Sequence, residues 1–282
     1  MRIHKSIDDM RAASRAARLT GLRLGLVPTM GALHDGHLSL VRAAKAQCDV
    51  VVVSIFVNPL QFGPNEDLAK YPRTFERDCE LLEREGIDFL FAPSAEEMYP
   101  ADAVTYVTVE GLSDKLCGRS RPGHFRGVTT VVAKLFDIVE PDLAFFGQKD
   151  AAQATIIRRM VRDLDFAVEI MVSPIVRELD GLAMSSRNAY LSPQQRKSAL
   201  VLYRSLAEVK RRFDQGERNA ANLIEAGRHV LAQESAVRPD YLEIVDPDTL
   251  DPLPELNRPA LVAVAAFLGS TRLIDNLLLS PK

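Results

Sequence analysis

Short apolar runs alternate with segments of helical periodicity over about the first 172 residues of the chain. The runs are rich in β-branched residues and have the length of buried strands. They lie at 22–28, 49–57, 88–92, 142–146 and 168–172. The helical segments between them include 74–85, 127–139 and 151–164, and apolar residues from Leu38 to Ala44 form a further helical face. This alternation predicts βαβ units around a parallel sheet.

The pattern changes after Pro174. Ser192 and Pro193 predict the N-cap and first residue of a long helix, and a second helix is expected from about 219 to 234. Consecutive strands follow at about 240–246, 260–268 and 272–279. Helices followed by neighbouring strands favour a small antiparallel sheet. The sequence therefore predicts an α/β fold with a parallel-sheet domain over 1–174 and a smaller C-terminal α+β domain over 175–282, with a hinge near 173–190.

Composition narrows the class of protein. The 282 residues are 47% hydrophobic and 26% charged, and the formal net charge is −3. This balance argues against nucleic acid or an anionic membrane surface as the main partner. Cys48, Cys79 and Cys117 are odd in number and widely spaced, which predicts neither a disulfide framework nor a zinc site. With no apolar stretch long enough for a bilayer and no apparent leader, we expect a cytoplasmic enzyme or binding protein.

The segment 28–37 places two histidines where the first predicted strand gives way to a helix. His34 and His37 stand on either side of Gly36. Backbone N–H groups in a first helical turn lack partners within the helix, and the helix dipole is positive there, so such a turn suits an anion. Gly31 and Gly36 would allow close approach of a ligand. Two histidines near a turn are more often surface or core residues, so the motif gains weight only beside others.

Two amides follow the second predicted strand. Asn58 and Gln61 both donate and accept hydrogen bonds, which suits the hydroxyl and carboxylate groups of a small substrate. Asn58 and Pro59 equally predict a simple turn. The carboxyl ends of parallel strands lie at one edge of a sheet, so these amides and the histidines are expected to converge there.

A cation follows the fourth predicted strand. Lys149 stands at the start of a helix, where the dipole disfavours positive charge, and a bound phosphate would relieve that conflict. The alternative is a solvated ion pair with Asp150. Gln153 lies one turn further along and can face the same ligand.

Two loops add further cations. Loop 181–188 contains Ser185, Ser186 and Arg187, and the planar fork of arginine suits phosphate oxygens. Loop 119–126 contains Arg119, Arg121, His124 and Arg126 and could close over an anionic substrate. Either loop could instead be an ordinary exposed one.

In this order, the motifs resemble the pantothenate synthetase (pantoate–β-alanine ligase) family of the H-I-G-H nucleotidyltransferase superfamily. The resemblance covers almost the full chain and includes a loop at 184–187 in place of the K-M-S-K-S sequence of the wider group. It rests on the segments 28–37, 56–62, 71–74, 146–150, 181–188 and 271–276.

The resemblance implies a Rossmann-like N-terminal domain that binds ATP and pantoate, a C-terminal domain that covers it, and a homodimer. It implies ATP-dependent condensation of (R)-pantoate with β-alanine through pantoyl adenylate, with release of pyrophosphate and AMP. Gln61 would bind pantoate and β-alanine, and Gln153 would bind pantoate. Asn58 is a candidate substrate contact from its amide alone. The implied ATP contacts are Met30, Gly31, Ala32, Leu33, His34, Asp35, Gly36, His37, Gly147, Gln148, Lys149, Asp150, Val176, Met184, Ser185, Ser186 and Arg187.

The expected catalytic residues are donors and cations, because negative charge builds on phosphate oxygens during attack at the α-phosphate. They are His34, His37, Lys149 and Arg187, with His37 implied as a proton donor. Mg²⁺ is implied with the nucleotide and is expected to be held mainly by ATP phosphates. Asp78 is a weak candidate ligand, and an ordinary exposed helical carboxylate is the simpler interpretation.

Two other functions stay open from the residues alone. A nucleotidyltransferase would keep the nucleotide on its product, and a regulatory module would bind a nucleotide without catalysis. Analysis of the product distinguishes a nucleotidyltransferase from a ligase. Pantoate-dependent pyrophosphate exchange distinguishes an enzyme from a regulatory module.

Overall fold

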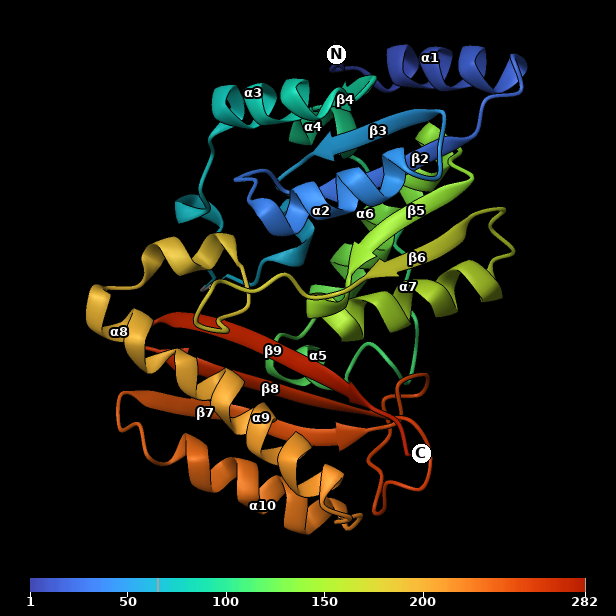
Figure 1. Cartoon of the computed structure of the whole chain (residues 1–282). Coiled ribbons are helices and arrows are strands. Elements are labelled where there is room, and N and C mark those ends of the chain that lie inside the picture. Colours follow the sequence, from blue (N-terminus) through green and yellow to red (C-terminus); the bar gives the residue numbers. More distant parts are fainter. Residues whose placement is uncertain (65, 282) are drawn as a thin grey trace. The chain divides into compact units, whose positions relative to one another are not determined.

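The computed structural model describes residues 1–64 and 66–281 and contains two compact units (Figure 1). One comprises Met1–Ser113, Arg121–Gly147 and Ile156–Pro174, and the other comprises Asp114–Ser120, Gln148–Thr155 and Ile175–Lys282. The chain passes from the first unit to the second for the last time after Pro174, where the sequence predicts the domain boundary. Two segments within 1–174, however, pack with the C-terminal unit. The division into domains 1–174 and 175–282 stays a prediction.

The first unit is built on a six-stranded parallel sheet, as the α/β pattern predicts. The order is β1-β4-β3-β2-β5-β6, and every neighbouring pair is parallel. The expected strands are found with ends shifted by at most two residues, and β1 was not expected. The strands are β1 (Arg2–His4), β2 (Leu24–Thr29), β3 (Val50–Ile55), β4 (Phe89–Phe91), β5 (Leu143–Gly147) and β6 (Glu169–Ser173).

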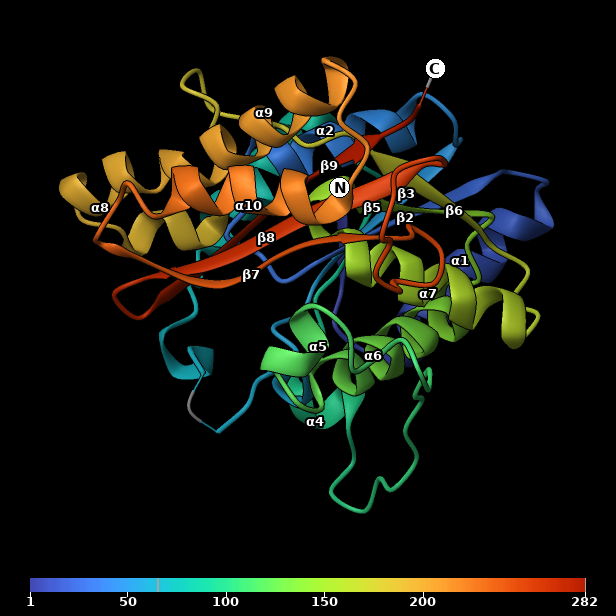
Figure 2. The ribbon, with the colours of Figure 1, turned by 90° about the horizontal axis from the view of Figure 1, so that it is seen from below.

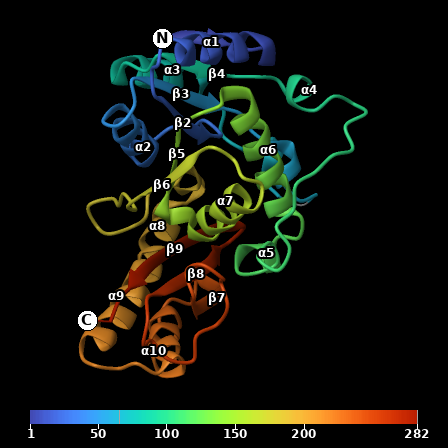
Figure 3. The same cartoon turned by 90° about the vertical axis from the view of Figure 1, so that its right-hand side faces the viewer.

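Helices cover both faces of this sheet, and α2 and α6 lie on opposite sides of the strands (Figure 3). On the α2 side, Val41 and Leu82 pack against Val27, Val53 and other strand residues in one apolar cluster. The α6 helix begins three residues earlier than expected. The helices around this sheet are α1 (Ile7–Leu19), α2 (Asp35–Lys45), α3 (Phe75–Glu85), α4 (Ala95–Met98), α6 (His124–Val139) and α7 (Ala151–Asp163).

The second unit has a three-stranded antiparallel sheet of order β7-β8-β9, with α9 and α10 packed on one face (Figure 2). Ser192 caps α8 through a capping box with Gln195, as expected for an N-cap. The predicted long helix is divided at Ala199. The elements are α5 (Cys117–Ser120), α8 (Pro193–Ser198), α9 (Leu200–Asp214), α10 (Ala220–Leu231), β7 (Val237–Val245), β8 (Ala260–Leu268) and β9 (Thr271–Leu279).

Side chains of β7 and β9 alternate between the two faces of this sheet. Leu242 and Leu273 belong to the apolar cluster formed with α9 and α10. Tyr241 and Arg272 face the other way, where Tyr241 Oη lies 3.1 Å from the Sγ of Cys117 in α5. This alternation sends neighbouring residues of one strand to different partners. Within the described residues, no helix is long and apolar enough to cross a membrane.

Candidate active site

The expected turn between the first predicted strand, which is β2, and the helix that follows it is confirmed. β2 ends at Thr29, and α2 begins at Asp35. The backbone between them is unusual, because Gly31 (φ 79°) and Ala32 (φ 50°) both have positive φ. Such a conformation costs an alanine of the order of 1 kcal/mol, so other contacts must hold the turn in place. The hydroxyl of Thr29 does so in part, accepting the Gly31 N–H at 3.1 Å.

The two histidines cap α2. His34 is the N-cap, and its Nδ1 accepts the N–H of Gly36 at 3.1 Å. The Nδ1 of His37 accepts the N–H of His34 at 3.4 Å. Since both Nδ1 atoms act as acceptors, the proton of each neutral imidazole lies on Nε2. The ring centroids are 4.1 Å apart. The turn therefore presents two neighbouring Nε2–H donors at a helix N-terminus.

Asp78 holds this turn from α3, and its expected exposure is wrong. The residue is 1% exposed. Its Oδ2 accepts the N–H of Ala32 at 2.8 Å, and its Oδ1 accepts the N–H of Leu33 at 2.9 Å and the hydroxyl of Thr74 at 3.1 Å. Both carboxylate oxygens are thus engaged by the protein itself. This geometry supports a role in holding the turn, and metal binding by Asp78 stays a prediction.

Asn58 and Gln61 lie together at the end of β3, in the 3₁₀ turn η1 (Pro59–Gln61). Asn58 is 1% exposed. Its Nδ2 donates to Gln61 Oε1 at 3.1 Å and to the Gly127 carbonyl at 3.0 Å, while its Oδ1 accepts the hydroxyl of Tyr99 at 2.9 Å. Gln61 Nε2 lies 3.0 Å from the Sδ of Met30. Asn58 is therefore placed to orient the amide of Gln61.

Arg121 and His124 of the predicted basic loop hold the backbone of Gln61. His124 Nδ1–H donates to the Gln61 carbonyl at 2.9 Å, because that oxygen can only accept. Arg121 forms a bidentate pair with Glu66, at 2.7 and 2.6 Å. Burial tends to raise the pKa of Glu66, but the hydrogen bonds and charge of Arg121 outweigh burial and lower that pKa. The pair therefore stays charged, and closure of this loop over a substrate stays a prediction.

Gly127 allows α6 to approach η1 closely, and a larger residue there should displace Gln61. A Cβ at position 127 would lie 2.3 Å from the Leu60 carbonyl oxygen and 2.6 Å from the Gln61 nitrogen. We expect Gly127→Ala to lower stability by about 1–3 kcal/mol and to lower kcat/KM for the substrate that Gln61 is expected to bind by roughly 10–100-fold. Thermal unfolding and steady-state kinetics measure these effects.

Gly63→Ala is the matched control, since a Cβ there lies 3.7 Å from the nearest side chain among the described residues. It should leave both quantities near the wild-type values. Equal kinetics for Gly127→Ala and wild type would contradict a tight coupling between α6 and Gln61.

In the second unit, Lys149 lies in the 3₁₀ turn η3 (Gln148–Asp150), directly before α7. Its Nζ is 3.7 Å from the Asp150 carboxylate, so the predicted alternative, an ion pair, is present. Gln153 lies in the first turn of α7, as expected. The carbonyls of Gln148 and Lys149 each accept a hydrogen bond from Asn276 of β9 at 2.9 Å.

A hairpin carries the predicted serine and arginine loop. Arg177 and Ala183 form an antiparallel bridge, and the N–H of Met184 donates to the Val176 carbonyl at 3.0 Å. Ser185 then caps the 3₁₀ turn η4 (Ser186–Tyr190), its Oγ accepting the N–H of Arg187 at 3.3 Å. The structure thus brings Val176 and residues 184–187 together.

The predicted site residues fall into two groups, one in each unit. The first contains residues 30–37, Asn58, Gln61 and Asp78, and Gly147 ends β5 in the same unit. The second contains residues 148–150, Gln153, Val176 and residues 184–187. In the described parts of the chain, no three His, Cys, Asp or Glu side chains gather as a metal-binding group.

Comparisons with known proteins agree along the whole chain. A sequence model of the family pantoate-beta-alanine ligase matches residues 2–278. The pantothenate synthetase of Koribacter versatilis is 62% identical over 99% of this chain and 96% of its own length. That of Thermotoga neapolitana is 58% identical over 99% of this chain and its full length.

Solved structures have the same fold. The pantothenate synthetase of Thermus thermophilus is 49% identical, superimposes with a TM-score of 0.95 and is covered completely in both chains. The pantoate-beta-alanine ligase of Francisella tularensis, solved as a complex with beta-gamma ATP and beta-alanine, is 34% identical, with a TM-score of 0.81 over 99% of this chain and 97% of its own. The chain therefore belongs to the pantoate–β-alanine ligase family of enzymes.

Proposed function

We propose that this enzyme joins pantoate to β-alanine in two steps, through pantoyl adenylate. A carboxylate oxygen of pantoate attacks the α-phosphorus of ATP, and the bond to pyrophosphate breaks. The amine of β-alanine then attacks the acyl carbon, loses a proton, and displaces AMP. The ATP-dependent condensation is the known reaction of the family, and the Francisella tularensis complex supports ATP and β-alanine as substrates.

The arrangement of His34 and His37 carries the proposal. Both Nδ1 atoms accept backbone N–H groups, so both rings have Nε2–H donors beside the N-terminus of α2. Donors fixed before the reaction stabilise charge that develops on phosphate oxygens, with little reorganisation. His34 and His37 are proposed to bind ATP phosphates, together with the backbone of residues 30–37.

Lys149 and Arg187 are proposed to supply positive charge to the departing pyrophosphate and to the α-phosphate. Gly147, residues 148–150, Val176 and residues 184–186 are proposed to complete the ATP contacts. Catalysis would then depend on position and charge and would not require a covalent enzyme intermediate.

Gln61 is proposed to bind pantoate and β-alanine, and Gln153 to bind pantoate. The amide of Gln61 is held by Asn58 on one side and by Met30 on the other. A preorganised amide loses little freedom when it binds a hydroxyl or carboxylate group. Asn58, predicted to contact substrate, is better supported as the residue that orients Gln61.

Mg²⁺ is proposed to accompany ATP, bound by its phosphate oxygens, because Asp78 has no oxygen left unengaged by the protein. A homodimer is proposed from the family resemblance. A cytoplasmic location is proposed from the three widely spaced cysteines, which are free thiols in the structure.

ATP–pyrophosphate exchange tests the first half-reaction directly. We expect exchange of labelled pyrophosphate into ATP only when pantoate is present, and AMP release in stoichiometric amounts only after β-alanine is added. A stable nucleotidylated product would instead identify a nucleotidyltransferase. ATP binding without any pantoate-dependent exchange would identify a regulatory module.

A further inference from the structure

Two polar residues stand side by side in β9, a strand with mostly apolar neighbours. Asp275 and Asn276 are each 3% exposed. Successive strand residues point to opposite faces of a sheet, and these two contact different loops. Asp275 contacts Arg177 of the hairpin that leads to residues 184–187, and Asn276 contacts the turn at 148–149.

Asp275 anchors the hairpin through a bidentate ion pair. Arg177 Nη1 and Nη2 donate to its two oxygens at 2.6 and 2.9 Å, and Nη1 also donates to the Gly181 carbonyl at 3.0 Å. The guanidinium lies over the ring of Tyr203, 4.6 Å from its centroid. The buried carboxylate therefore holds Arg177 at the base of the hairpin, and Arg177 in turn holds the turn at its tip.

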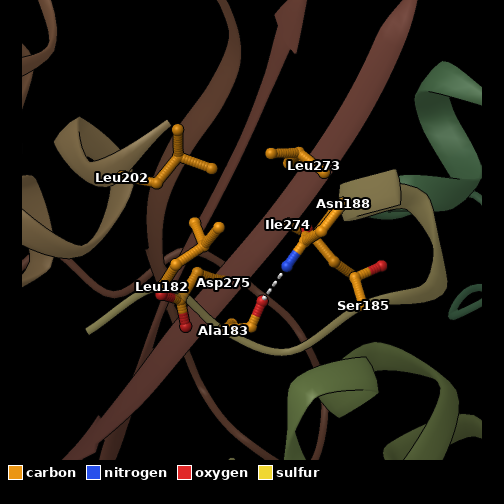
Figure 4. A pocket seen from close by; sticks show the side chains of 8 residues that line it. All are labelled: Leu182, Ala183, Ser185, Asn188, Leu202, Leu273, Ile274 and Asp275. Atoms are coloured by element: carbon orange, nitrogen blue, oxygen red, sulfur yellow. Dashed lines mark hydrogen bonds between the residues drawn. The ribbon is translucent and has the colours of Figure 1, made fainter. Parts of the chain in front are cut away.

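The loop that follows borders a small cavity. This cavity of about 10 Å³, room for about one water molecule, is lined by Leu182, Ala183, Ser185 and Asn188, by Leu202 of α9 and by residues 273–275 of β9 (Figure 4). Asn188 Nδ2 donates to the Ala183 carbonyl at 3.2 Å, while its Oδ1 is buried without a hydrogen-bond partner among the described residues. The base of this loop is therefore held to β9 by the ion pair between Arg177 and Asp275.

Asn276 anchors the other loop with its whole amide. Its Nδ2 donates to the carbonyls of Gln148 and Lys149 at 2.9 Å each, and its Oδ1 accepts Gln148 Nε2 at 2.9 Å. The N–H of Asn276 itself donates to Asp275 Oδ1 at 2.7 Å. The two anchors are thus linked directly.

We propose that Asp275 and Asn276 are positioning residues for ATP binding, which set the loops carrying Arg187 and Lys149 from the two faces of one strand. The proposal rests on the proposed function, because it assigns both loops to ATP. Neither residue needs to touch the nucleotide, and each acts through the loop it holds.

Asp275→Asn and Asn276→Asp test the two anchors with side chains of nearly the same shape. The first removes the charge that faces Arg177, and the second removes both N–H donors and places a carboxylate against two carbonyls. We expect each to weaken ATP binding about 10–100-fold, measured by calorimetry without pantoate. Leu278→Asn, at a position in β9 that is 53% exposed, is the control and should bind ATP like the wild type.

Hydrogen exchange in the nucleotide-free protein separates positioning from general loosening. Asp275→Asn should speed exchange in peptides that cover 176–188, and Asn276→Asp in those that cover 148–152. Similar acceleration throughout the chain in both variants, or ATP affinity within about twofold of wild type in folded variants, would overturn the proposal.

Arg177→Lys tests the same anchor from the loop side if Asp275→Asn does not fold. It keeps the charge but loses the planar fork, so it should also weaken ATP binding. Wild-type affinity in this variant would count against the inference. Failure of the wild-type protein to bind ATP would instead contradict the proposed function.

Discussion

Replacing His37 by alanine is expected to lower the rate of pantoate-dependent ATP–pyrophosphate exchange about 10²–10³-fold, the usual cost of removing one well-placed donor from a developing anion. His37 also supports the start of α2, where its Nδ1 accepts the N–H of His34. Loss of this cap should cost about 0.5–2 kcal/mol of stability. The two effects need to be separated.

Two amide substitutions separate them, because each imitates one nitrogen of the ring. The Oδ1 of asparagine can replace Nδ1 as the acceptor of the cap, whereas the Nε2 of glutamine can replace the Nε2–H donor. His37→Asn should therefore keep most of the thermal stability and lose the rate, and His37→Gln should retain more rate with less stability. His229→Ala, at an exposed position in the last turn of α10, controls for removal of a histidine elsewhere.

Near-normal exchange in His37→Asn would show that the donor has no role in catalysis. If His37→Gln exchanged no faster than His37→Ala, a single N–H donor would not account for the rate. The rate would then depend on the imidazole ring as a whole. Circular dichroism and the unfolding midpoint confirm that each variant is folded when its rate is measured.

The parallel sheet could be predicted because its strands are buried on both faces and form continuous apolar runs, such as 50–53 in β3. β1 could not, since three residues, Arg2–His4, leave no periodic signal and depend on pairing with β4. The capped histidine turn was predictable from its place between strand and helix. Its backbone conformation was not, because positive φ at Ala32 has no sequence signal.

The supporting residues of the candidate site were harder to predict because their roles depend on tertiary contacts. Asp78 was expected to be exposed, yet it lies four residues before the buried Leu82 on the same face of α3. Asp275 likewise shares a face of β9 with Leu273 and Leu277, both of which pack in the apolar cluster of the second unit. A carboxylate at an apolar position of a periodic pattern was the available signal in both cases.

Asp78→Ala is expected to impair both stability and activity. It leaves the N–H groups of Ala32 and Leu33 without the carboxylate that accepts them, at a cost of about 1–3 kcal/mol for each buried group left unsatisfied. We therefore expect the free energy of unfolding to fall by about 2–5 kcal/mol. Because the positive φ of Gly31 and Ala32 loses its support, the turn should relax and displace the histidines, which would lower the exchange rate about 10²-fold.

Asp78→Asn distinguishes this role from metal binding. Its one carbonyl oxygen can still accept a backbone N–H, but its NH₂ group faces the other, so stability and rate should lie between those of wild type and Asp78→Ala. Glu80→Ala, at an exposed position of the same helix, should change stability by less than about 0.5 kcal/mol. A positioning role predicts that the Mg²⁺ dependence of Asp78→Asn matches that of wild type. If excess Mg²⁺ instead restored the exchange rate of Asp78→Asn, Asp78 would be assigned as a metal ligand. A higher Mg²⁺ concentration can compensate for weaker metal binding but not for a displaced turn.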